Sequence, residues 1–99
     1  MRGVRGAIEE SGYRRWLAGM HRDRVVGRAA DCWSCPLSSY LKALGAEYAE
    51  VRSGSYIAGD KRRRLPVWAK RHIARVDAQG VWSKITAGAA LAALDAGAE

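Results

Sequence analysis

The sequence predicts a small, mostly helical α+β domain in which four helices accompany a short β-hairpin, in the order α-α-β-β-α-α. Apolar residues recur at helical spacing in four separate segments, and one segment between the second and third of them alternates as strands do. The 99 residues hold no internal repeat or linker, so residues 1–99 are expected to form a single domain. Hydrophobic residues make up 48% of the chain, which excludes a wholly disordered protein.

The first helix is expected over residues 9–20. Its apolar side chains fall within one arc of a helical wheel, at Tyr13, Trp16, Leu17 and Met20. Ser11 is the candidate N-cap, because a hydroxyl there accepts a hydrogen bond from a free backbone N–H of the first turn. Residues 21–34 show no helical period and are expected to form a connector that places Val25 and Val26 in the core.

The second helix is expected over residues 36–44. Pro36 suits a first helical turn, where its missing N–H costs nothing, and Gly45 suits the left-handed position that follows many helices. One apolar stripe joins Leu37, Tyr40, Leu41 and Leu44. The spacing of the apolar residues and the signals at both ends therefore predict the same helix.

Residues 46–60 alternate in the manner of strands and are interrupted by the Ser-Gly pair at 53–54. This pattern predicts a short β-hairpin whose apolar positions are Tyr48, Val51, Tyr56 and Ile57.

The third and fourth helices are expected over residues 66–78 and 87–96. Pro66 and Gly80 bound the third, and its apolar stripe comprises Leu65, Trp68, Ala69, Ile73 and Val76. The fourth follows a short apolar connector, with Thr86 as its N-cap and with Leu91 and Leu94 as its packing residues.

The charge balance favours an anionic partner. Lys and Arg number 17 against 10 acidic residues, a net charge of +7, and most of the basic residues are Arg, whose planar fork suits phosphate and stacks on bases. A genome rich in G and C would also enrich Arg, Ala and Gly, so composition alone does not decide. No apolar leader opens the chain and no stretch is long enough to span a bilayer, so we expect a cytoplasmic protein without a membrane partner.

Cys32 and Cys35 form a Cys-x-x-Cys motif directly before the second helix. A structural zinc site usually needs two close ligand pairs, and only the distant His21 and His72 are available to complete the set. A redox site of the thioredoxin kind follows a β-strand, and no strand is expected upstream here. Zinc and redox chemistry remain the weaker alternatives, and we expect no metal or cofactor.

The simplest interpretation of this motif is structural. Cys32, Trp33 and Cys35 would pack as hydrophobic residues at the start of the second helix, with Ser34 or Cys35 near its N-cap. His72 falls inside the apolar stripe of the third helix, where a lone His is more often a hydrogen-bonded core residue than a ligand or base. Acidic residues are scattered and no nucleophile or phosphate-loop motif is present, so we do not expect an enzyme.

The segment DKRRRLPVWAKRHIAR, residues 60–75, carries the strongest functional signal, because it holds seven basic residues and one acidic residue. If Arg64 extends the helical pattern, it shares one flank with Arg71 and Arg75, beside Trp68. Such a stripe can follow a phosphate backbone while the ring stacks on a base; a solvated helix face with Trp68 in the core is the alternative. The expected binding residues are Lys61, Arg62, Arg63, Arg64, Trp68, Lys70, Arg71 and Arg75.

We therefore expect a small non-catalytic binding module that engages nucleic acid or a nucleoprotein complex. The alternative is a protein-interaction module, such as an inhibitor or accessory subunit of a phage or mobile element, which docks on an acidic protein surface. Like charges this close repel one another, so either interpretation calls for an acidic partner. The long connector between the first two helices does not fit a helix-turn-helix.

Overall fold

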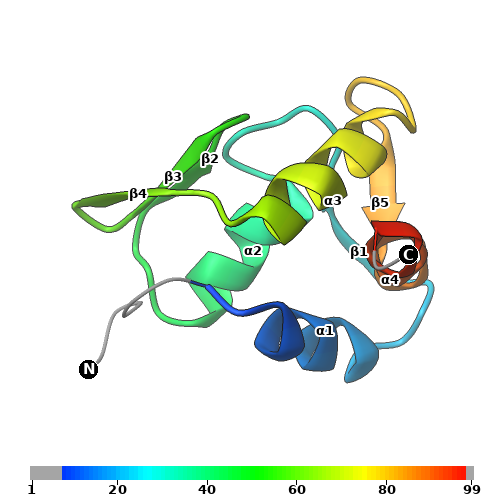
Figure 1. Cartoon of the computed structure of the whole chain (residues 1–99). Helices are drawn as coiled ribbons and strands as arrows, with labels where there is room; N and C mark the ends of the chain where they lie inside the picture. The colour runs from blue at the N-terminus through cyan, green and yellow to red at the C-terminus, as the bar shows by residue number, and fades with distance from the viewer. Residues whose placement is uncertain (1–7, 98–99) are drawn as a thin grey trace.

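The computed structural model describes residues 8–97 and confirms the α+β class (Figure 1). Four helices and five strands lie within that range: α1 (Glu10–Ala18), β1 (Val25–Arg28), α2 (Pro36–Ala43), β2 (Ala49–Val51), β3 (Ser55–Ala58), β4 (Lys61–Arg64), α3 (Val67–Asp77), β5 (Lys84–Thr86) and α4 (Ala87–Gly97). All four predicted helices are present, but the predicted order α-α-β-β-α-α omitted three strands. None of the helices described is long and apolar enough to cross a bilayer.

The predicted hairpin is the first part of a three-stranded antiparallel sheet with strand order β2-β3-β4. Gly59 adopts φ 66° and forms, with Asp60, the tight connection that returns the chain along β3. The residues that follow this turn, 61–64, therefore extend as β4 at the edge of the sheet. Figure 1 shows this sheet at one end of the molecule and the β1–β5 pair at the other.

The two segments predicted to be connectors pair with each other as β1 and β5. Val26 is buried as expected, but Val25 is 49% exposed because neighbouring residues of a strand point to opposite faces. A register shift between Val25 and Gly27 bends β1 beside the loop that leads into α2. These strands lie far apart in sequence, so no local pattern could reveal their pairing.

The helix ends agree with the sequence at α2 and α4 and differ at α1. Cys35 is the N-cap of α2, where its sulfur accepts a hydrogen bond from the Ser38 N–H at 3.4 Å, and Gly45 follows the helix at φ 111°. Thr86 Oγ1 accepts a hydrogen bond from the Ala89 N–H at 3.1 Å, which confirms its capping role. Ser11 is not a cap, since α1 begins after Glu9 without any side-chain cap.

The core forms where the apolar stripes of the helices meet the inner faces of the strands. Its largest fully buried side chains include Tyr13, Leu17, Leu37, Leu41, Tyr56 and Ile85. Trp16, Met20 and Trp68 pack against this cluster and are partly buried. Trp33 is 53% exposed, which corrects the expectation that it packs as a hydrophobic residue at the start of α2.

Candidate functional site

The cysteine pair has the local structure of a helix start. Both cysteines are free thiols, and Cys35 is buried while Cys32 is partly exposed. Burial raises the pKa of the Cys35 thiol, although its hydrogen bond from Ser38 acts in the opposite direction. A reactive Cys-x-x-Cys site requires a lowered pKa, so burial acts against a reactive thiolate at Cys35. The expectation that no strand precedes the motif is wrong, because β1 lies directly upstream of Cys32.

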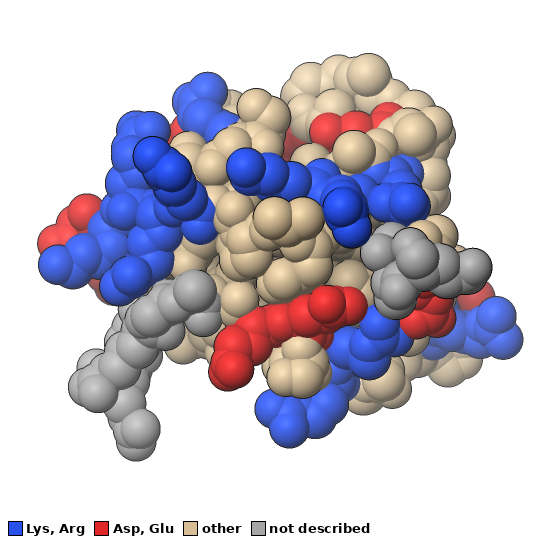
Figure 2. Space-filling view, viewed as in Figure 1, with Lys and Arg blue, Asp and Glu red and all other residues tan. Residues whose placement is uncertain are grey.

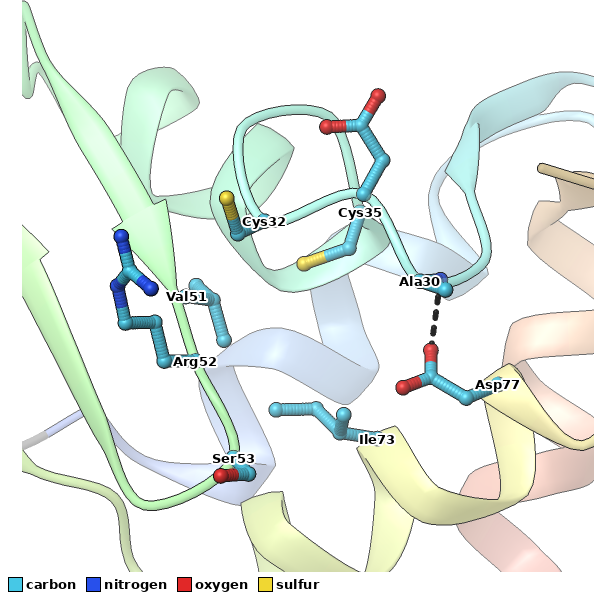
Figure 3. A pocket seen from close by; sticks show the side chains of 9 residues that line it. Ala30, Cys32, Cys35, Val51, Arg52, Ser53, Ile73 and Asp77 are labelled. Atoms are coloured by element: carbon cyan, nitrogen blue, oxygen red, sulfur yellow. Dashed lines mark hydrogen bonds between the residues drawn. The ribbon is translucent and has the colours of Figure 1, made fainter. Parts of the chain in front are cut away.

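The two cysteines border a cavity of about 360 Å³ between the α2 start, the β2 end and α3 (Figure 3). Two of the charged groups around it make structural contacts. Asp77 Oδ1 accepts a hydrogen bond from the Ala30 N–H at 2.8 Å, and Arg52 is paired with Glu50. Both charges are therefore engaged within the fold.

The candidate zinc ligands do not come together. The His72 side chain is buried in the core, where Nε2 lies 2.7 Å from the Tyr13 hydroxyl. His21 follows α1 with an exposed side chain beside Asp23. No cluster of three or more His, Cys, Asp or Glu side chains suited to a metal occurs among residues 8–97.

The basic residues of segment 60–75 divide between a strand and a helix. The predicted helical stripe is wrong, because Arg64 lies in β4 and is separated from α3 by Leu65 and Pro66. Arg71 and Arg75 do share one flank of α3, where an Arg75 guanidinium nitrogen donates to the Arg71 carbonyl at 3.4 Å. We call the whole set the basic surface; it comprises Lys61, Arg62, Arg63, Arg64, Lys70, Arg71 and Arg75.

All seven side chains of the basic surface are exposed, and none forms an ion pair with an acidic residue in the described part of the chain. By contrast, Arg14 pairs with Glu10 and Asp95. Figure 2 shows Lys and Arg atoms gathered over the end that holds β4 and in a band across α3. The fold thus concentrates unneutralised positive charge on two adjacent elements.

Trp68, the predicted stacking residue of this surface, is only partly exposed. It packs against the core, and its ring centroid lies 5.7 Å from that of Tyr13. The exposed aromatic residues near the three-stranded sheet are instead Trp33 and Tyr48, which sequence reasoning assigned to packing and to a strand. The only sequence signal for them was their polar neighbours, Asp31 and Ser34 beside Trp33 and Glu47 beside Tyr48.

No protein-family model, curated protein or solved structure matches this chain. The function is therefore inferred from the chemistry of the surface itself.

Proposed function

We propose that this chain is a small non-catalytic module that binds nucleic acid through the basic surface. The observation that carries the proposal is the absence of acidic partners for seven exposed cations on β4 and α3 in the described part of the chain. Adjacent like charges repel one another, and a bound polyanion removes that repulsion and releases its own counterions.

The arrangement of the charges favours an extended ligand over a single anion. Four consecutive basic residues, 61–64, alternate between the two faces of an edge strand, while Arg71 and Arg75 lie on a separate helix. A nucleic acid carries phosphates at regular short intervals and can contact both elements at once. Arg also suits phosphate better than Lys does, because its planar fork donates two parallel hydrogen bonds.

Edge protection is a competing explanation for the charges on β4. Charged side chains on an edge strand prevent two sheets from pairing edge to edge, and β4 is such an edge. That explanation does not cover Arg71 and Arg75, which lie on α3. It also predicts that uncharged polar substitutions leave ligand binding unchanged.

The test compares two triple variants with the same change in net charge. The first carries Arg62→Gln, Arg63→Gln and Arg64→Gln; the control carries Arg15→Gln, Arg22→Gln and Lys84→Gln, three exposed residues without ion pairs in the described chain. Binding of a fluorescent mixed-sequence oligonucleotide is measured by anisotropy between about 50 and about 300 mM salt. We expect the first variant alone to bind more weakly and its log–log salt slope to fall by about one unit for each phosphate contact that is lost.

Two outcomes would overturn the proposal. One is an equal loss of affinity in both variants, which would mean that only net charge matters. The other is no binding of single-stranded or duplex oligonucleotide by the unmodified protein at low salt. Capture of an acidic protein from nuclease-treated lysate, with that capture abolished by the first variant, would then favour the protein-docking alternative.

A further inference from the structure

We infer that the outer face of the β2-β3-β4 sheet binds single-stranded nucleic acid, with bases stacked at Trp33 and Tyr48 and phosphates held by Arg62 and Arg64. This inference rests on the proposed function and names the form of nucleic acid that the surface recognises. Three observations support it: the register of the strands, the hydrogen bonds that hold Trp33, and the positions of the basic side chains that have no acidic partner in the described chain.

Strand register decides which basic residues share a face with the aromatic pair. Residues directly opposite in an antiparallel sheet point to the same side, so Glu50, Ile57 and Arg62 form one row. Tyr56 and Ala58 of β3 are buried and point inward, so the row through Ile57 points away from the core. Arg64, opposite Ser55, joins this outer face, while Lys61 and Arg63 belong to the other.

Trp33 lies at the β2 edge of this outer face. The preceding carbonyl, that of Cys32, accepts a hydrogen bond from the Val51 N–H at 2.7 Å and so attaches the loop to the strand. The Trp33 indole N–H donates to the Tyr48 hydroxyl at 3.1 Å, and that hydroxyl in turn donates to Glu50. The outer face therefore carries two aromatic rings, 53% and 44% exposed, at the edge opposite β4.

The exposed Trp33 is held in place rather than left free. Its backbone N–H donates to Asp31 Oδ1 at 3.0 Å, and its carbonyl accepts from Lys42 Nζ at 2.8 Å. With the indole bond to Tyr48, three hydrogen bonds hold a residue that is still 53% exposed. An ordered, exposed Trp loses little additional conformational entropy on binding. Such residues therefore often contribute much of the binding energy at recognition surfaces.

Glu50 neutralises one cation of the outer face and leaves the others without an acidic partner among residues 8–97. It is only 5% exposed, and hydrogen bonds from Tyr48 and Arg52 hold its pKa below the usual value of a glutamate. Arg52 is thereby neutralised by Glu50. On the same face Arg62 and Arg64 have no acidic partner within the described residues, so they are the groups available to phosphate.

The dimensions of the sheet fit a single strand. Neighbouring strands lie about 4.8 Å apart, so β4 lies roughly 10 Å from β2 across the sheet. A nucleotide whose base stacks at the β2 edge can therefore place neighbouring phosphates near β4. A duplex hides the faces of its bases within the stack, whereas a single strand exposes them to an aromatic platform of this kind.

The experiment compares Trp33→Ala with Trp82→Ala. Trp82 is 58% exposed and precedes β5, at the end of the molecule opposite the three-stranded sheet, so it is a matched control (Figure 1). The probes are a labelled mixed-sequence single-stranded DNA and the corresponding duplex, and thermal unfolding confirms that both variants fold.

We expect Trp33→Ala to weaken single-strand binding about tenfold to a hundredfold, because a base–aromatic stack contributes about that factor. The salt slope should not change, since no phosphate contact is lost, and duplex binding and Trp82→Ala should show no effect. Trp33→Phe retains a ring without the indole N–H and should restore most of the affinity.

Equal effects of Trp33→Ala and Trp82→Ala, or an equal loss of single-strand and duplex binding in Trp33→Ala, would overturn this inference. If Arg62→Gln with Arg64→Gln still lowered the salt slope, the proposed function would stand while the stacking platform failed. If the unmodified protein bound neither probe, the proposed function itself would fail.

Discussion

The hydroxyl of Tyr13 on α1 lies 2.7 Å from Nε2 of His72 on α3, and this contact joins two buried side chains separated by 59 positions. The two rings also meet edge to face, with centroids 5.0 Å apart. Nδ1 of His72 is buried and has no hydrogen-bond partner. The buried position of His72 therefore favours a neutral imidazole over a charged one.

This environment predicts that stability falls in mild acid. Burial, with a smaller contribution from the charge of Arg75, lowers the pKa of His72 from 6.5 to about 4. The unfolded chain then binds more protons than the folded one between these values, so stability present above pH 6.5 is lost as pH falls towards 4. One pKa unit corresponds to about 1.4 kcal/mol, so the loss reaches about 3 kcal/mol.

Urea unfolding of the protein and of His72→Gln at several pH values measures this contribution. Gln can keep a hydrogen bond to Tyr13 but does not titrate, so the difference between the two proteins isolates the histidine from other groups. Between pH 6.5 and 4, we expect the free energy of unfolding to fall more steeply for the unmodified protein than for His72→Gln. Parallel pH profiles would show that His72 does not titrate with the lowered pKa.

The Cys35 cap predicts different effects for two conservative substitutions. Cys35→Ala removes the acceptor for the Ser38 N–H and should cost about 1 kcal/mol relative to Cys35→Ser, whose hydroxyl can accept the same hydrogen bond. Thermal unfolding of both variants measures the difference, and Cys32→Ala serves as a neighbouring control outside the cap. Equal melting temperatures for the Ala and Ser variants at position 35 would contradict a capping role.

The close approach of β1 to the α2 loop predicts that Gly27 does not tolerate a side chain. A Cβ at this position would lie 2.3 Å from the Ser34 carbonyl oxygen, a backbone atom that cannot rotate away. Gly27→Ala should therefore lower the free energy of unfolding by about 2 kcal/mol or more.

Gly54→Ala is the matched control, because no heavy atom lies within 4 Å of a Cβ built there. It should change stability by less than about 0.5 kcal/mol in the same urea titration. Similar stabilities of the two variants would mean that the loop before α2 adjusts to relieve the contact.

The amino-acid sequence by itself determined the four helices and the hairpin. Helical period, the proline at the first position of α2 and the glycine after that helix act between residues a few positions apart, so they can be recognised without the fold. The same reasoning identified the basic segment and the capping function of Thr86. It also placed His72 in the core, because its position on the helical wheel lies between apolar residues.

Tertiary structure alone decided how the candidate surface is arranged. The β1–β5 pairing joins residues far apart in the chain. Arg64 was expected to continue the helical stripe of Arg71, but it lies in β4, which pairs with β3. The exposure of Trp33 depends on the loop that Cys32 attaches to β2 and on the hydroxyl of Tyr48. Local patterns do not encode these contacts, because each depends on which distant segment the folded chain brings alongside.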